Sequence, residues 1–497
     1  MKSQIEENGI VVLTDDAMEE IRDSPLWNED FRPCSKDEHT WGAGTFSSLW
    51  VGMCLCVPSY TMASGFLTLG MSWWQSLLTI FLGSVIVLIP LLLNASAGCK
   101  FGIPFPMFAK IWFGRRGSHI PALLRGLVSA GWFGINTWIG ATVIDDMLCI
   151  IFDSWDGEES HRMIIFFEFL VVNVAIGAKG LQAIRSFIKI ATPLVGISAL
   201  SLFAWAISEG HGLAPILSHQ GSLYKMEDFL EIFFPCLTVV ISFWATVSLN
   251  VSDFTRYSAS NKAQLKGQAF ALPLSMTAIA FVAICVTSVA MVTFGEAIWY
   301  PEQLLIKFPK PVIFIGGIVI ALSSVMVNVV ANLVAPARAM ENLYPRRLSF
   351  AAGAMATGVV AVAMQPWHNL ENFDHFMFGI LNFFGVLIGP MNGIALADYW
   401  VVRKKRIELK ELYAPNGRYN YTAGFNLHAI ASLALGMIIP LVGRVAPGLS
   451  FMSENALMFG LVISGASYIL LMRGDASLLS AEDYDRITIY PEKSQAL

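Results

Sequence analysis

Charged residues are scarce in this chain of 497 residues: Asp, Glu, Lys and Arg make up 14% of it, whereas 55% of the residues are hydrophobic. A soluble chain of this length would divide into several domains and would carry about 25% charged residues. The sequence also lacks a Gly-rich phosphate loop that ends in Lys-Ser/Thr, so we expect no direct use of ATP. The composition predicts a membrane protein.

Patterns that bind metals or form disulfides are missing as well. The seven cysteines include no C-x-x-C pair and no His/Cys cluster with zinc spacing, and most lie within or beside apolar segments. We therefore predict free thiols, no metal site and no cofactor. The eight histidines include no H-E-x-x-H motif and most lie outside the apolar segments, which argues against an enzyme embedded in the membrane.

Long apolar segments dominate the rest of the chain. About twelve of them, each of roughly 20 residues, follow one another from residue 46 to residue 473, and each is long enough to cross about 30 Å of hydrocarbon as a helix. The fold class predicted is an all-α polytopic membrane protein. Residues 1–45 and 474–497 are polar, without the apolar core of a cleavable signal peptide, and we expect them to form solvated tails.

Basic residues fall in alternate loops, after the second, fourth, sixth, eighth and tenth apolar segments. They are Lys100, Lys110, Arg115, Arg116, Lys179, Arg185, Lys189, Arg256, Lys262, Lys266, Arg338, Arg346, Arg347 and the "RKKR" run at 403–406. The intervening loops are poor in them, and "DSWDGEESHR" (153–162) is largely acidic. Because basic loops stay in the cytoplasm, the pattern predicts an even number of spans in the cell membrane, with both termini cytoplasmic.

Two segments, the first and the sixth, have polar or proline-containing interiors. "FSSLWVGMCLCVPSYTMASGFLTLG" (46–70) carries Pro58 near its middle, and "FFPCLTVVISFWATVSLNVSDFTR" (233–256) opens on Pro235 and has a polar centre. Since proline removes a helix hydrogen bond, such breaks in lipid line a protein or water cavity; a simple kink is the alternative for the first. Interrupted segments five apart in order indicate an inverted-repeat transporter with a site at the midplane.

Tryptophans and amides accompany these segments. Trp132 and Asn136 share one helix face in the third segment, Trp244 lies in the sixth, and Asn328 and Asn332 share a face in the eighth. Indole faces stack on a flat conjugated ring, and amides offer a donor and an acceptor to its N–H and C=O edges. The alternatives are tryptophans that face lipid or pack, and two asparagines that bond to each other. The combination favours a flat, amide-like ligand.

A series of motifs resembles the nucleobase:cation symporter-1 family over roughly residues 26–473. The motifs are "NEDFRP", "TWGAGTFSSLWVGM", "LGMSWWQSL", "NASAGCKFGIPFPMFAK", "GSHIPALLRGLVSAGWFGINTWIG", "SFWATVSLNVSDFTRY", "KGQAFALP", "ANLVAPARA" and "GPMNGIALADYWVVRKKRI". The resemblance is to the branch that handles uracil, allantoin, purines or hydantoins. It implies two inverted five-helix repeats, at 46–208 and 209–400, with discontinuous first and sixth helices, and two additional helices within 401–473.

The resemblance also implies a substrate site. The family holds its substrate between a tryptophan of the third span and one of the sixth, positions that match Trp132 and Trp244 here. One turn after the first tryptophan the family usually has Gln or Glu, and this chain has Asn136 there. The family's eighth-span asparagine matches Asn332. A polar first-span position falls on Cys56. These departures are compatible with the binding of a flat ring, but they do not identify which ring is bound.

The same resemblance places a degenerate cation site. Sodium-coupled relatives use first-span carbonyls, which would be those of Gly52 and Leu55, and two eighth-span hydroxyls, whose positions hold Met326 and Val327 here. Neither side chain offers the hard oxygen ligand that such a cation needs. The alternative hydroxyls are those of Ser323 and Ser324. We predict that transport does not depend on sodium.

A proton is the expected replacement, and it needs a titratable group near the cavity. The proton-coupling candidates are Asp145, Asp146, Glu168 and Asp253. An ion pair with Arg256 is the alternative role for Asp253, and Asp398 beside "RKKR" is expected to be an interfacial anchor. Uncoupled facilitated diffusion remains an alternative.

The interpretation is a secondary transporter, not an enzyme, that imports a nucleobase or cyclic ureide by alternating access in the lipid bilayer. Uracil comes first, because its alternating C=O and N–H edge suits two short amides; allantoin, hydantoin and purines follow. No nucleic-acid partner is expected. The alternatives are a substrate sensor or an uncoupled facilitator of the same fold, or an amino-acid carrier. Glycine and proline residues at span ends can act as hinges or allow close packing of helices, and we favour packing. They are Gly98, Gly102, Pro104, Gly389 and Pro390.

Overall fold

The computed structural model describes residues 2–179, 181–218, 221–296, 298–344, 347–370 and 375–491. The side chains of residues 181–189, 369 and 447 are outside this description. Of the predicted features, Arg346, the side chains of Arg185 and Lys189, and residues 492–497 of the C-terminal tail therefore lie outside the described residues.

Helices that can cross a membrane make up most of the described chain. Eight are long and apolar enough, a bent pair can form a ninth span, and three shorter apolar helices correspond to the remaining predicted segments; all are numbered below as spans in chain order. In order, spans 1 to 6 are α2 (Ala43–Cys54) with α3 (Val57–Thr68), α4 (Trp73–Phe101), α6 (His119–Ile151), α7 (Glu159–Ala178), α8 (Leu181–Glu209) and α10 (Met226–Asn250).

The later spans include two that change helix type along their length. Spans 7 to 12 are α12 (Asn261–Phe294); α14 (Lys310–Val327) with η3 (Asn328–Leu333) and α15 (Val334–Leu343); α16 (Phe350–Ala363); η4 (His375–Leu381) with α18 (Asn382–Leu396) and η5 (Ala397–Val402); α19 (Leu427–Val442); and α21 (Ala456–Leu471). The segments η3, η4 and η5 are π-helical. The fold is that of a polytopic helical membrane protein.

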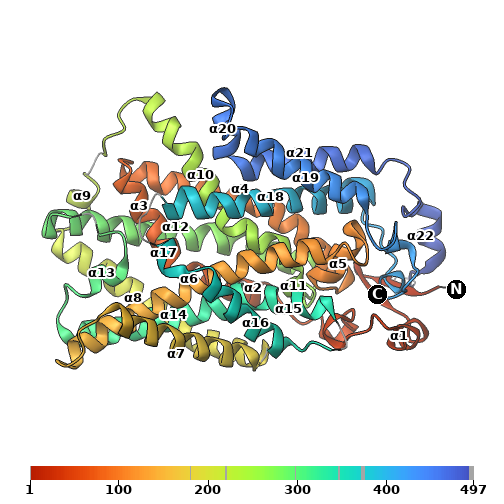
Figure 1. Cartoon of the computed structure of the whole chain (residues 1–497), viewed down its shortest axis with the longest axis horizontal. Coiled ribbons are helices and arrows are strands. Elements are labelled where there is room, and N and C mark those ends of the chain that lie inside the picture. Colours follow the sequence, from red (N-terminus) through yellow and green to blue (C-terminus); the bar gives the residue numbers. More distant parts are fainter. Residues whose placement is uncertain are drawn as a thin grey trace, which may run out of the picture.

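The spans lie roughly side by side, and both tails meet at one end of the bundle, called the tail face below (Figure 1). Here α1 (Asp15–Arg22), α5 (Phe105–Phe113) and α22 (Ala481–Ile487) gather. Strand β1 (Gln4–Glu7) pairs antiparallel with β2 (Ile10–Leu13) and parallel with β3 (Thr488–Ile489), which ties the two tails together. The opposite end, the far face, carries α9 (Leu213–Ile216), α13 (Pro301–Leu305) and α17 (Pro366–Asn369).

The first span breaks as expected. The two helices α2 and α3 meet at a bend of 55° between Cys54 and Val57. Cys56 is extended and precedes α3, and Pro58 lies in the first turn of that helix, where its missing N–H would have no helical partner in any case. The break therefore lies just before the proline, and the predicted discontinuity of the first helix is confirmed.

The sixth span differs from the prediction at its centre. Helix α10 runs without interruption from Met226 to Asn250, and a break follows only at Val251, before the short α11 (Ser252–Thr255) at the tail face. No glycine or proline occurs between Pro235 and this break. Three of the central polar residues, Thr246, Ser248 and Asn250, bond within the helix or to neighbours; the Thr246 hydroxyl, for example, donates to the carbonyl of Phe243 at 2.9 Å. The polar centre therefore does not interrupt the helix.

Glycines allow several spans to approach closely. A Cβ added to Gly98 would lie 2.7 Å from Ser252 Cα, and one added to Gly389 would lie 2.9 Å from Leu457 Cα. Gly102 ends α4 in the left-handed conformation, with φ of 61°. The expected packing role is confirmed for Gly98 and Gly389, since backbone from another span occupies the space that a side chain would need.

Alanine at Gly393 tests this close packing of spans 10 and 12. The new Cβ would lie 2.9 Å from the backbone carbonyl carbon of Leu461, so we expect a loss of about 1–3 kcal/mol in stability because α18 and α21 must separate. Thermal unfolding of the purified protein measures this. Gly44→Ala is the matched control, because nothing lies within 4 Å of its added Cβ; equal unfolding temperatures of the two variants would contradict the prediction.

Asp398 is buried rather than interfacial. Its side chain and that of Arg403 are both 0% exposed, with Arg403 Nε 3.0 Å from Asp398 Oδ2. The Tyr468 hydroxyl donates to Asp398 Oδ1 at 2.7 Å. The expected interfacial anchor is therefore wrong. The basic run after span 10 turns one arginine inward, because a carboxylate buried at the end of that span needs a cation as partner.

Candidate functional site

The two predicted tryptophans belong to one aromatic cluster at the middle of the bundle. Trp132 on α6 and Trp244 on α10 are 4% and 3% exposed. Both rings pack edge-on against Phe243, with centroids 5.0 and 4.7 Å away, and Trp244 also packs against Trp50 at 5.1 Å. The structure therefore brings the tryptophans together through Phe243. Sequence reasoning missed Phe243 and Trp50, although Phe243 directly precedes Trp244.

Span 10 closes the cluster from another side. The Trp132 ring meets Phe376 at 5.9 Å and Phe384 at 6.1 Å between centroids. Phe376 lies in the π-helical segment η4, which opens this span. Because π-helical turns frequently occur at functional sites, the start of span 10 is well placed to cover a ligand beside Trp132.

A hydrogen-bond donor is left over within this cluster. Among the described residues, the buried indole N–H of Trp244 has no hydrogen-bond partner; the same holds for the hydroxyl of Ser242 on the same helix and, away on α14, for that of Ser324. Buried polar groups are rarely left unpaired, since each costs about 1–3 kcal/mol. Unpaired groups beside aromatic rings are typical of a site that accepts a polar ligand.

The amide of Asn136 turns back onto its own helix. Its Nδ2 donates to the carbonyl of Trp132 at 3.0 Å, and the side chain is 1% exposed. This bond holds the amide one turn from the indole, as the spacing of the two residues predicts. The structure thus places Trp132 and Asn136 on one face of α6.

The second pair of amides joins three spans. Asn332 Nδ2 donates to Asn328 Oδ1 at 3.2 Å, so the two asparagines bond to each other. Asn328 Nδ2 in turn lies 3.0 Å from Thr137 Oγ1 and 3.2 Å from Asn173 Oδ1. Asn328 therefore holds spans 3, 4 and 8 together, which is the packing alternative. Asn332 stands at the end of this network, within the π-helical segment η3.

The predicted cation site is organised around the break in the first span. Ser323 Oγ donates to the carbonyl of Leu55 at 3.0 Å, while Met326 Sδ accepts from Thr192 Oγ1 at 3.4 Å. Val327 is buried. The hydroxyl that meets the broken helix is therefore that of Ser323, the alternative considered above. A cavity of about 70 Å³ lies beside this contact.

Two further predicted residues lie near the break. Gly52 is buried in α2, one turn before Leu55. Cys56 is 5% exposed and precedes α3, with its Sγ 3.1 Å from Ser59 Oγ. The Cys56 thiol and the Ser323 hydroxyl line the same small cavity. The structure therefore gathers the first-span residues of the predicted substrate and cation sites around one break.

The predicted carboxylates lie in different places. Asp145 accepts from the Trp155 indole at 2.8 Å and pairs with Arg162 at 3.0 Å, so it belongs to a structural ion pair near the far face. Asp146 is half-buried beside it, and Glu168 is exposed on α7. An exposed position keeps Glu168 away from the aromatic cluster.

Asp253 lies at the tail-face end of span 6, and its hydrogen-bond partners differ from the ion pair with Arg256 that was the alternative. Its carboxylate accepts from the Phe105 backbone N–H at 2.8 Å and from Asn250 Nδ2 at 3.0 Å. Arg256 instead donates to the carbonyl of Asp30 in the N-terminal tail at 2.9 Å. Arg256 therefore bonds to the N-terminal tail and not to Asp253, so the ion pair considered as an alternative does not form.

Sequence reasoning missed a buried arginine in span 3. Arg125 is 1% exposed, and its guanidinium donates to Asn250 Oδ1 at 3.1 Å and to the carbonyl of Ala331 at 3.4 Å. Asn250 also bonds to Asp253. Arg125 therefore joins the tail-face ends of spans 3, 6 and 8 below the aromatic cluster. A single arginine within an apolar segment was the available signal.

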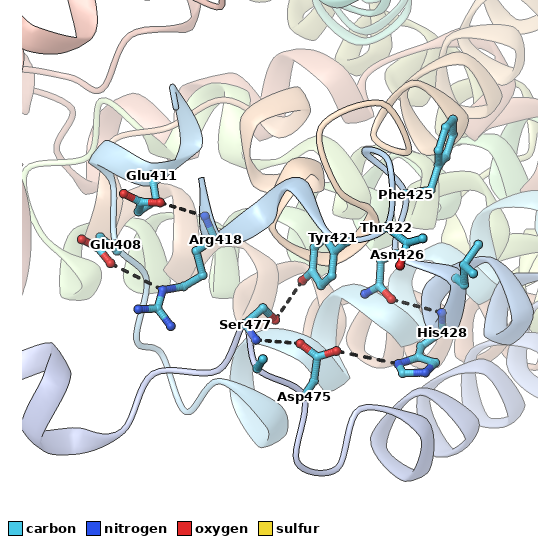
Figure 2. A pocket seen from close by; sticks show the side chains of 12 residues that line it. Glu408, Glu411, Arg418, Tyr421, Thr422, Phe425, Asn426, His428, Asp475 and Ser477 are labelled. Atoms are coloured by element: carbon cyan, nitrogen blue, oxygen red, sulfur yellow. Dashed lines mark hydrogen bonds and ion pairs between the residues drawn. The ribbon is translucent and has the colours of Figure 1, made fainter. Parts of the chain in front are cut away.

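A larger hollow, of about 690 Å³, opens on the tail face and is separate from this cluster. Figure 2 shows its polar wall, in which His428 faces Asp475 and Arg418 faces Glu408. The two pairs are 4.0 and 3.6 Å apart. None of the predicted site residues lines it. Its charged side chains pair within the loop after span 10 and between the start of α19 and the C-terminal tail.

Comparison with known proteins assigns the family. A model of permeases for cytosine/purines, uracil, thiamine and allantoin matches residues 33–464. The chain belongs to this permease family. It is similar to the purine-uracil permease of Arabidopsis thaliana, with 35% identity over 470 residues that cover 90% of this chain and 78% of the relative.

Two further likenesses support the assignment. The allantoin permease of Bacillus subtilis is 35% identical over 461 residues, which cover 90% of this permease and 93% of the relative. A solved nucleobase-cation-symport-1 family transporter, in a closed conformation with bromovinylhydantoin bound, superposes with a TM-score of 0.79 at 25% identity, covering 93% of this chain and 99% of that one. The relatives are permeases and transporters rather than enzymes, so the predicted family and the absence of an enzyme activity are confirmed.

Proposed function

We propose that this permease imports uracil or a related cyclic amide by alternating access, coupled to protons and not to sodium. Allantoin, hydantoin and purines follow uracil in order of expectation. The observation that carries the proposal is the aromatic cluster of Trp132, Phe243 and Trp244 with an unpaired indole N–H inside it. A flat ring with a carbonyl edge would take up that N–H and stack on the indoles.

The amides supply the edges of the site. Without a ligand, Asn136 and Asn332 bond to Trp132 and Asn328, so a ligand with N–H and C=O groups would exchange these internal bonds for its own. Asn328 is anchored independently, by Thr137 and Asn173. It would hold span 8 in place while Asn332 turns toward the ring.

The first-span break supports sodium independence. At this break the Leu55 carbonyl accepts a hydrogen bond from Ser323, whose hydroxyl is the alternative cation ligand. The residues at the two hydroxyl positions, Met326 and Val327, carry no oxygen in their side chains. A proton-driven cycle needs no cation at this point.

The arrangement of the chain in the membrane is part of the same proposal. Residues 46–208 and 209–400 would form the two inverted repeats, and the tail face would be cytoplasmic. The basic residues support this orientation, because Lys100, Arg256 and Arg403 each bond to a residue of the N- or C-terminal tail.

Uptake of labelled uracil by cells that express the chain tests the function. We expect uptake to persist when sodium is replaced by potassium and to be lost when the proton gradient is collapsed. Cells without the chain are the control. Uptake that requires sodium would contradict the interpretation of Met326 and Val327, and uptake that survives both treatments would indicate uncoupled facilitation. If uracil is not carried, competition by allantoin and hydantoin identifies the ring.

A further inference from the structure

Glu302 is a buried carboxyl group on the far face. It lies in α13, the short helix between spans 7 and 8 (Figure 1). The residue is 7% exposed, and its Oε2 is buried without a hydrogen-bond partner in the described part of the chain. Among the described residues no Lys, Arg or His lies within ion-pair distance of it. A buried carboxylate without a partner is strongly disfavoured, so the site favours the neutral acid.

The groups around Glu302 are acids and phenols. Helix α3 carries one titratable residue, Tyr60. Its hydroxyl and that of Tyr300, next to α13, are both buried and have no hydrogen-bond partner among the residues that the structure describes. From α6, the Asp146 carboxylate acts on Glu302 by charge repulsion. None of these groups compensates a negative charge on Glu302.

The nearby cations are engaged elsewhere. Lys310, the one titratable residue of α14, donates to the carbonyl of Ile150 at 3.2 Å. Lys307, just after α13, pairs with Glu296 at 3.1 Å. Burial, together with the charge of Asp146, raises the pKa of Glu302 to about 8. The carboxyl group therefore carries a proton at neutral pH while α13 is closed.

Helix α13 lies against the moving part of the proposed cycle. It packs on α3, which follows the first-span break, and on α14, whose Ser323 bonds to the Leu55 carbonyl at that break. Pro301 of α13 and Tyr60 of α3 line the same cavity of about 70 Å³ as Leu55, Cys56 and Ser323. Lifting α13 away from α3 would open this cavity toward the far face and bring Glu302 into water.

We propose that Glu302 must take up a proton from the far-face solution before α13 can close over the broken first span. The step converts a carboxylate and a solvent proton into a carboxylic acid, and the reverse occurs when α13 lifts. In water the ordinary carboxylate is ionised at neutral pH, so closure captures one proton. The inference rests on the proposed function for its role in transport, since it makes closing over the substrate depend on the proton.

Infrared titration of the purified permease in lipid tests the protonation directly and needs no substrate. We expect a carboxylic-acid C=O band that disappears between pH 7 and 9, that is missing in Glu302→Gln, and that persists in Glu296→Gln. Glu296 is the matched control because it lies on the same loop, exposed and paired with Lys307. The absence of any wild-type band that Glu302→Gln removes would overturn the proposal.

Exchange of labelled for unlabelled substrate across vesicles tests the consequence. In the wild type and in Glu296→Gln, exchange should fall by about tenfold for each pH unit above about 8, the slope of a single titrating group. In Glu302→Gln it should stay level over this range. A variant that keeps the wild-type fall would overturn the proposal. If the wild type exchanges no cyclic amide, the proposed function fails instead, and the infrared titration still decides the protonation of Glu302.

Discussion

Alanine at Trp132 is expected to lower the affinity for the transported ring by about 30- to 150-fold. Removing the indole deletes a stacking partner worth roughly 1 kcal/mol and a buried apolar contact worth roughly 1–2 kcal/mol more. The contacts of Trp132 with Phe243, Phe376 and Phe384 show that one side of the aromatic cluster would be lost with it. Substrate binding to the purified permease, and the KM of uptake, measure the change.

Trp138→Ala is the matched control for this variant. Trp138 lies on the same helix, six residues further, but it packs against Phe166 and Trp367, with ring centroids 5.8 and 6.1 Å away. We expect it to alter protein yield more than affinity. Normal affinity in Trp132→Ala, with normal amounts of folded protein, would place the ring elsewhere in the bundle.

Leucine at Arg403 is expected to cost about 3–5 kcal/mol of stability, because it leaves the Asp398 carboxylate buried without its cation. Neither side chain of this pair is exposed. The guanidinium also donates to the carbonyls of Ile111 and Ser477, at 3.1 and 3.0 Å, so it joins α5, the end of span 10 and the C-terminal tail. The yield of monodisperse protein and its thermal unfolding measure the loss.

Two variants make this second prediction specific. Lys404→Leu removes the next basic residue, which is exposed, and we expect little change. The double variant Asp398→Asn with Arg403→Leu removes both charges, so it should be more stable than Arg403→Leu alone. A double variant as unstable as the single one would show that the contacts with the tail, and not the unpaired charge, carry the effect.

The class of protein, the number of spans and the broken first helix could be predicted from the sequence. Each depends on local properties, namely the length of apolar segments and a proline among small polar residues. The spacing of Trp132 and Asn136 also sufficed to place both on one helix face. The polar centre of the sixth span was misleading, because polar side chains there bond without breaking the helix.

Only the tertiary structure decided which distant residues meet. It placed Phe243 between the tryptophans and the Ser323 hydroxyl on the Leu55 carbonyl. It also turned Arg403 inward to Asp398 and buried Glu302 of α13 at the far face. From the sequence alone, a charged residue in a polar loop is expected to be exposed to solvent. Whether it is buried depends on how that loop folds back on helices hundreds of residues away, which local sequence does not encode.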